Sequence, residues 1–106
     1  MNMFDAQHSR FATFGVISKI PGELIDRVWF IIDNDLRGLV PLDNLLKFKL
    51  INNGGSVSIH FSQQGLDTAM AFDQDIEYQD GYPDMLLAYD DGDIQTILLP
   101  EEANEH

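Results

Sequence analysis

The chain of 106 residues contains no cysteine. This absence excludes a disulfide framework, a thiolate zinc site, an iron–sulfur cluster and a cysteine nucleophile. Long apolar runs are also missing, because the longest, Val28–Ile32, falls far short of the roughly 20 residues that cross a membrane as a helix. The first residues lack the basic and apolar regions of a signal peptide. Together these absences predict a cytoplasmic protein with no membrane partner.

Lysine and arginine are missing from residues 50–106. All six basic residues lie in residues 1–49 together with six acids, so that half has no net charge. The other twelve acids lie in residues 50–106 and give the chain its formal net charge of −12. Because a nucleic-acid backbone or an anionic membrane is bound by basic patches, we expect no direct nucleic-acid binding. The charge instead favours a basic protein as partner.

The composition is that of one globular domain, with 44% hydrophobic and 10% aromatic residues. We expect this domain to span residues 1–100 and residues 101–106 to form a flexible acidic tail. One amphipathic helix is predicted from about Gly22 to Leu36, and Phe30 and Ile31 should widen its apolar stripe. The stripe consists of Leu24, Ile25, Val28, Trp29, Ile32 and Leu36.

Strand patterns occupy most of the remaining chain. Residues 10–18 are rich in aromatic and β-branched residues, and residues 45–65 form a predicted hairpin around the turn sequence NNGG. Residues 66–72 are either a short strand or a link. Residues 85–99 form a second predicted hairpin with its turn at Asp91-Gly92. The predicted fold class is α+β, with one main amphipathic helix packed on an antiparallel sheet of about four to six strands.

The stretch FDQDIEYQDGYPDMLLAYDDGD, residues 72–93, contains eight acids and no basic residue. Alternate residues of a strand lie about 6.6 Å apart, so the first three acids would form a regular anionic row on one face if extended. Tyrosines among the acids are residues that often anchor protein interfaces. The candidate partner-binding residues are Asp73, Asp75, Glu77, Asp80, Asp84, Asp90, Asp91, Asp93, Tyr78 and Tyr82.

Metal binding is the first alternative, because Asp73, Asp75 and Glu77 are spaced like the start of a calcium loop. The loop pattern then requires glycine where the chain has Tyr78 and a bidentate glutamate where it has Asp84. We therefore expect no specific metal site, and at most weak divalent-cation binding.

Catalytic motifs are not found. The chain has three histidines but no G-x-S-x-G elbow, P-loop, dinucleotide fingerprint or H-E-x-x-H sequence. Acids on an open anionic hairpin also lack an apolar pocket to separate their pKa values. We expect no enzyme, no catalytic residue and no cofactor.

The first half of the chain contains several short motifs: MFD near the start, RFATFGV, IPGEL, the Trp and Ile-Asp of RVWFIID, and LDNLLKFKL. These motifs resemble those of a family of small uncharacterised domains from Gram-positive bacteria and their phages. The resemblance covers about residues 3–50. The acidic half is expected to be this protein's own elaboration. The resemblance implies a phage or mobile-element context in a bacterial host, and no catalytic residues.

Two functions follow from these patterns. The first is an acidic, non-enzymatic, phage-type inhibitor that binds a basic nucleic-acid-binding protein by DNA mimicry. A CRISPR-Cas nuclease is the expected target, and in overall character the chain is similar to phage anti-CRISPR proteins. The alternative is a small structural or regulatory domain whose acidity serves solubility, or a weak divalent-metal-binding protein. Convergence of the eight acids on one face would favour the inhibitor, and their dispersal would favour solubility.

Overall fold

The computed structural model describes residues 4–5, 8–67 and 69–103. The described residues form an α+β fold built on one sheet of six strands. The strands are β1 (Ser9–Ala12), β2 (Leu45–Asn53), β3 (Ser56–Ser62), β4 (Met70–Glu77), β5 (Met85–Asp90) and β6 (Ile94–Leu98). Their order across the sheet is β1-β6-β5-β2-β3-β4, which leaves β1 and β4 at the edges.

Both predicted hairpins are confirmed. β2 and β3 pair antiparallel, and the turn between them contains Gly54 and Gly55 with φ of 64° and 102°. β5 and β6 also pair antiparallel, and Gly92 in their connection has a φ of 98°. Glycine adopts these positive φ values without the steric cost that a Cβ atom imposes. The glycines therefore fix both turns.

The sheet is mixed, so the expectation of a purely antiparallel sheet is wrong. β1 pairs parallel with β6, with Ser9 opposite Ile94. The expected strand over residues 10–18 is also wrong beyond Ala12, because helix α1 (Phe14–Lys19) follows. The side chain of Thr13 caps this helix by accepting a hydrogen bond from the backbone N–H of Val16 at 3.2 Å. A cap of this kind outweighs the strand propensity of the residues that follow.

The predicted helix over residues 22–36 is divided into two parts. Helix α2 (Gly22–Phe30) is regular, and it continues as a π-helical segment, η1 (Ile31–Leu36). The π-helical spacing is seen in the hydrogen bond from the N–H of Arg37 to the carbonyl of Ile32, five residues back, at 3.0 Å. Among the described residues α2 is the only helix longer than six residues.

The helical stripe is confirmed in part. Leu24, Val28 and Ile32 are fully buried, whereas Ile25 and Trp29 are half-buried against the core. Phe30 does not widen the stripe, since 58% of it is exposed. Phe30 is two residues from Val28, and residues at that spacing point to different sides of a helix.

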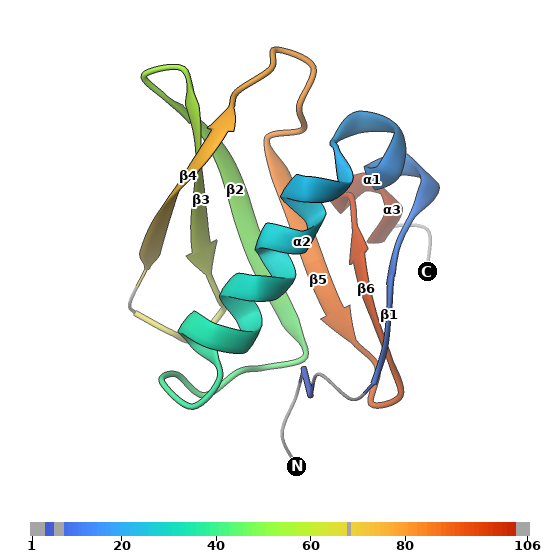
Figure 1. Ribbon diagram of the computed structural model, residues 1–106. Coiled ribbons are helices and arrows are strands. Elements are labelled where there is room, and N and C mark those ends of the chain that lie inside the picture. The colour runs from blue at the N-terminus through green and yellow to red at the C-terminus, as the bar shows by residue number, and fades with distance from the viewer. Residues whose placement is uncertain (1–3, 6–7, 68, 104–106) are drawn as a thin grey trace.

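Figure 1 shows α2 lying diagonally across one face of the curled sheet. The core forms between this helix and the inward residues of the central strands, among them Phe48 and Phe61, whose ring centroids lie 5.7 Å apart. No helix among the described residues is long and apolar enough to cross a membrane.

The acidic stretch begins on a strand. β4 starts at Met70 and runs to Glu77, so only the end of the ambiguous segment 66–72 is strand. At the other end of the chain, a short helix α3 (Pro100–Ala103) follows β6. The carboxylate of Glu102 accepts hydrogen bonds from Thr13 Oγ1 at 2.7 Å and from the N–H of Leu99 at 2.8 Å. The rest of the expected tail, residues 104–106, lies outside the described residues.

Candidate interaction surface

Strand β4 presents exposed acids at a free edge of the sheet. It pairs with β3 alone, and Asp73, Asp75 and Glu77 are all exposed. Asp73 lies opposite Ser58 and Glu77 opposite Ser56. These two acids therefore project from the face of the sheet that α2 does not cover.

A bulge interrupts the row of acids. Between the pairs formed by Asp73 and Glu77, β4 has three residues where β3 has only Val57. Bulges of this kind twist an edge strand and hinder further strand pairing. The three acids alternate with less exposed residues along β4, but their spacing is less regular than on an ideal strand, because Asp75 lies within the bulge.

The carboxylate of Asp73 is oriented by a chain of hydrogen bonds. Ser58 Oγ donates to Asp73 Oδ1 at 2.7 Å, and His60 Nε2 lies 3.0 Å from Ser58 Oγ. Because the single hydroxyl proton goes to Asp73, His60 Nε2 carries the proton that it shares with Ser58. A hydrolase triad has the opposite order, in which histidine accepts the serine proton. Ser58 and His60 therefore hold the carboxylate of Asp73 in place at the edge of the sheet.

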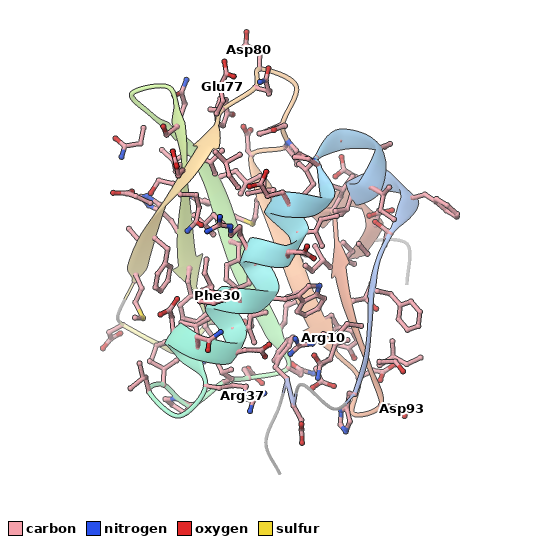
Figure 2. The ribbon with its side chains drawn as sticks, viewed as in Figure 1. Arg10, Phe30, Arg37, Glu77, Asp80 and Asp93 are labelled. Atoms are coloured by element: carbon pink, nitrogen blue, oxygen red, sulfur yellow. The ribbon has the colours of Figure 1, made fainter. Side chains whose placement is uncertain are left out.

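The connection from β4 to β5 adds Asp80 and Asp84, both exposed. Figure 2 shows Glu77 and Asp80 at the same end of the molecule. Tyr78 and Tyr82 hold this connection: their rings meet edge to face with centroids 5.6 Å apart, and both pack against the core. The two tyrosines are half-buried supports of the acidic connection, with part of each ring open to solvent.

The remaining three acids lie elsewhere. Figure 2 shows Asp93 at the end of the molecule opposite Glu77 and Asp80. Asp90 is only 1% exposed, and its Oδ1 accepts a hydrogen bond from the N–H of Gly92 at 2.8 Å. The eight acids therefore do not converge on one face. The five exposed acids of β4 and the β4–β5 connection are called here the acidic edge: Asp73, Asp75, Glu77, Asp80 and Asp84.

Asp91 organises the turn between β5 and β6. Its Oδ1 accepts hydrogen bonds from the backbone N–H groups of Ile94 at 2.7 Å and Asp93 at 2.9 Å. These two bonds, that from Ile94 first, lower the pKa of Asp91 below its ordinary value of 3.8. Asp91 thus has a structural role in the hairpin.

The ion pairs of the described residues do not include the acidic edge. Within residues 4–5, 8–67 and 69–103, salt bridges join Arg10 to Asp33, Arg37 to Asp33 and Arg27 to Glu23. All of these residues belong to the neutral half of the chain. In the same described ranges, no three His, Asp or Glu residues gather in a way that could hold a metal ion.

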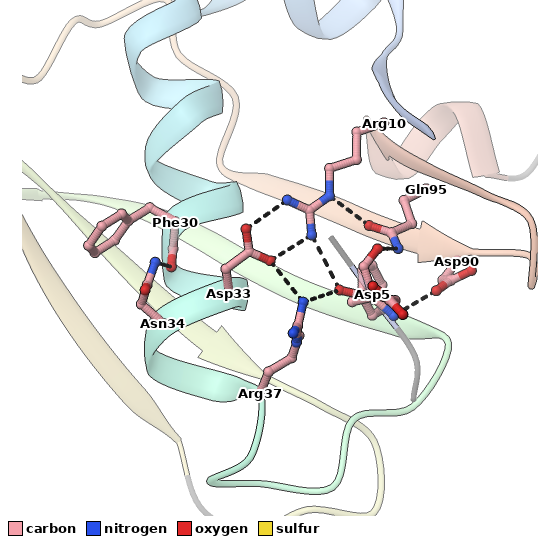
Figure 3. A network of polar contacts seen from close by, with 9 residues as sticks. Asp5, Arg10, Phe30, Asp33, Asn34, Arg37, Asp90 and Gln95 are labelled. Atoms are coloured by element: carbon pink, nitrogen blue, oxygen red, sulfur yellow. Dashed lines mark hydrogen bonds and ion pairs between the residues drawn. The ribbon is translucent and has the colours of Figure 1, made fainter. Parts of the chain in front are cut away.

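Sequence reasoning missed a polar network at the far end of the sheet from Asp80. Arg10 on β1 binds both carboxylate oxygens of Asp33, and its Nε donates to Gln95 Oε1 at 2.8 Å (Figure 3). The Arg10 guanidinium also lies 4.6 Å from the ring centroid of Trp29, a cation–π contact. These residues follow no regular spacing in the sequence, so their contacts could not be predicted. They are brought together only by the fold.

The network also holds the segment that precedes β1. The N–H of Phe4 donates to Asp90 Oδ2 at 2.7 Å, and its carbonyl accepts from Arg37 Nη1 at 3.2 Å. Gln95 Nε2 donates to the carbonyl of Asp5 at 2.7 Å. Phe4 and Asp5 of the MFD motif are therefore held in the fold through their backbone groups, whereas Met3 lies outside the described residues.

Comparison with known proteins matches most of the described chain to one family. The family model described as Staphylococcal protein of unknown function (DUF960) matches residues 9–102. The chain belongs to this family. Because the match extends far beyond residue 50, the expectation that the acidic half is this protein's own elaboration is wrong: both halves belong to the family's domain.

The fold recurs in a solved structure. The crystal structure of the protein of unknown function from Enterococcus faecalis is 47% identical to this chain, and the match covers 96% of each chain with a TM-score of 0.94. No curated protein matches the chain.

Proposed function

We propose that the chain is a non-enzymatic, acidic binding protein that occupies the nucleic-acid groove of a basic protein. The observation that carries this proposal is the acidic edge. It presents five exposed carboxylates on β4 and the β4–β5 connection, and none of the salt bridges among the described residues includes any of them. A surface of this charge is repelled by nucleic acid and attracted by the surfaces that bind nucleic acid.

Charge density supports a nucleic-acid groove as the target. Duplex DNA carries about one negative charge per 1.7 Å of its axis, and proteins that bind it align lysine and arginine side chains along a groove. The acidic edge offers such a groove carboxylates in place of phosphates. Attraction between the two surfaces accelerates association and sets the orientation of the partner.

The target class that we propose is a nuclease of the CRISPR type, inhibited in the cytoplasm of a bacterial host. The phage context implied by the family resemblance supports this choice, together with the division of charge between the two halves of the chain. The surface is smaller than the sequence predicts. Asp90 is buried, and Asp91 and Asp93 belong to a turn at the other end of the sheet.

The dispersal of the acids favours a second candidate. In this alternative the chain is a structural or regulatory domain, and its acidity keeps it soluble. Acids at both ends of the sheet suit this function, because solubility depends on the net charge of the protein and not on whether the charges lie on one surface. The two candidates differ in whether the acidic edge matters more than other acids.

A matched pair of variants separates the two candidates. The edge variant is Asp73→Asn, Asp75→Asn, Glu77→Gln, and asparagine at position 73 keeps an acceptor for Ser58. The control variant, Glu23→Gln, Asp26→Asn, Asp93→Asn, removes the same number of charges from exposed positions on α2 and in the β5–β6 turn, outside the acidic edge.

The experiment measures binding of the three proteins to purified basic nucleases by calorimetry. We expect the original chain and the control variant to bind alike, and the edge variant to bind at least tenfold more weakly. Affinity should fall steeply between about 50 and 200 mM salt, as it does for phosphate-binding surfaces. Equal loss in both variants, or no binding by any of the three, would favour the solubility function.

A further inference from the structure

Phe4 is held as a bound peptide residue would be. Its side chain is fully buried, and charged side chains bind both polar groups of its backbone. The N–H donates to Asp90 Oδ2 at 2.7 Å, and the carbonyl accepts from Arg37 Nη1 at 3.2 Å and Arg10 Nη2 at 3.3 Å. Backbone groups in folded chains are satisfied mostly by other backbone groups. The bond to Asp90 has the short distance typical of a charged acceptor, and the two arginine contacts are longer.

The groups that bind Phe4 are fixed by other contacts. Asp90 is 1% exposed, and its second oxygen accepts from the N–H of Gly92. Arg10 is bonded to Asp33 and to Gln95. Asp90 and Arg10 therefore keep their positions through contacts that do not involve Phe4.

The backbone of Phe4 is adapted to this surrounding. It is the only non-glycine residue of the described chain with a positive φ, at 62°. For a bulky residue this conformation is an outlier, and such outliers persist only where the surrounding structure imposes them. The pocket and its three charged groups thus determine the conformation of Phe4.

We propose that this pocket, called here the Phe4 pocket, is a recognition site for an aromatic residue within a polypeptide. Its ligand gives an N–H to Asp90, receives hydrogen bonds from Arg10 and Arg37 at its carbonyl, and places its ring in the core. Phe4 fills the site in cis and so closes it to other segments. An aromatic peptide fills it in trans once the Phe4 ring is removed. The site lies apart from the acidic edge, so the inference does not depend on the proposed function.

The test must remove the ring, because a covalently attached segment competes at an effective concentration in the millimolar range. The probe is an acetylated and amidated peptide of sequence MNMFDA, and the matched probe has alanine in place of phenylalanine. Both are titrated into the full chain carrying Phe4→Ala. Binding is followed by melting temperature and by the fluorescence of Trp29, the single tryptophan, which lies against Arg10.

We expect a saturable rise in the melting temperature of the Phe4→Ala chain with the phenylalanine peptide, and at least tenfold weaker binding of the alanine peptide. The original chain should respond to neither. A folded Phe4→Ala chain that does not respond, or that responds equally to both peptides, would overturn the proposal.

A second variant keeps the proposal testable if Phe4→Ala does not fold. Phe4→Leu retains an apolar side chain in the pocket, and the phenylalanine peptide should displace it with weaker apparent affinity. Adding Asp90→Asn to that variant should weaken peptide binding about tenfold, since the charged acceptor of the ligand N–H is lost. Adding Asp93→Asn, in the neighbouring turn, should leave binding unchanged. Equal binding by the two double variants would contradict the assignment of Asp90.

Discussion

The guanidinium of Arg10 binds both carboxylate oxygens of Asp33, with 2.8 Å from Nη1 to Oδ2 and 2.6 Å from Nη2 to Oδ1. Arg10 belongs to edge strand β1 and Asp33 to the π-helical segment η1. The pair therefore joins the helical layer to the edge of the sheet. Arg10 also stacks on Trp29, so one side chain links two positions of the helical layer to β1.

Arg10→Ala should destabilise the fold by about 2–3 kcal/mol, because Asp33 loses a two-pronged, partly buried partner. The measurement is urea unfolding at neutral pH. The matched control is Arg27→Ala: the Arg27–Glu23 pair is longer, at 4.0 Å, and its side chains are 45% and 63% exposed. Its removal should cost less than about 1 kcal/mol. Equal costs for the two substitutions would show that the Arg10–Asp33 pair is no stronger than a surface pair.

Trp29→Ala should cost about 2–3 kcal/mol, below the 3–5 kcal/mol typical of a fully buried ring, because Trp29 is half-buried. Trp29→Phe should cost less, since it keeps an aromatic face for Arg10. A double-mutant cycle of Trp29→Ala with Arg10→Ala should give a coupling of about 0.5–1 kcal/mol. Strict additivity would mean that the cation–π contact contributes nothing.

Asp91 should make stability depend on pH in the acid range. Backbone N–H groups of Ile94 and Asp93 lower its pKa in the folded state below 3.8. The stabilisation is therefore present above the unfolded-state pKa, and it is lost as pH falls through the lowered folded-state pKa. A carboxyl-detected NMR titration should give Asp91 a midpoint below 3.8, the ordinary value. A midpoint at or above that value would contradict the bonding seen in the turn.

The elements that could be predicted from sequence are those set by neighbouring residues. Gly54, Gly55 and Gly92 supply positive φ where each hairpin turns, so both hairpins follow from local patterns. The spacing of Leu24, Val28 and Ile32 likewise located the buried side of α2.

What could not be predicted depends on residues far apart in the chain. The parallel pairing of β1 with β6 joins Ser9 to Ile94, and no local pattern encodes that contact. The hydrogen bond from Phe4 to Asp90 spans 86 positions. For the same reason the sequence predicted a partner-binding role for Asp90, although its burial leaves it no access to a partner.

The division of the acids between the two ends of the sheet also could not be predicted from the sequence. Acids that are close in sequence are separated by the length of β5, as the opposite positions of Asp80 and Asp93 show (Figure 2). The bulge in β4 breaks the regular spacing that alternate acids would have on an ideal strand. The sequence therefore showed that the stretch is acidic, but it did not show where the acids lie in the folded protein.

The central claim is that the acidic edge blocks the nucleic-acid groove of a basic nuclease. The most direct measurement is cleavage of labelled DNA by a CRISPR nuclease in the presence of the original chain, the edge variant and the control variant, all shown to be folded by circular dichroism. We predict that the original chain and the control variant inhibit cleavage alike, that the edge variant loses at least tenfold in potency, and that excess guide or target nucleic acid relieves inhibition. Equal inhibition by all three proteins, or no inhibition by any across a panel of basic nucleases, would contradict the account.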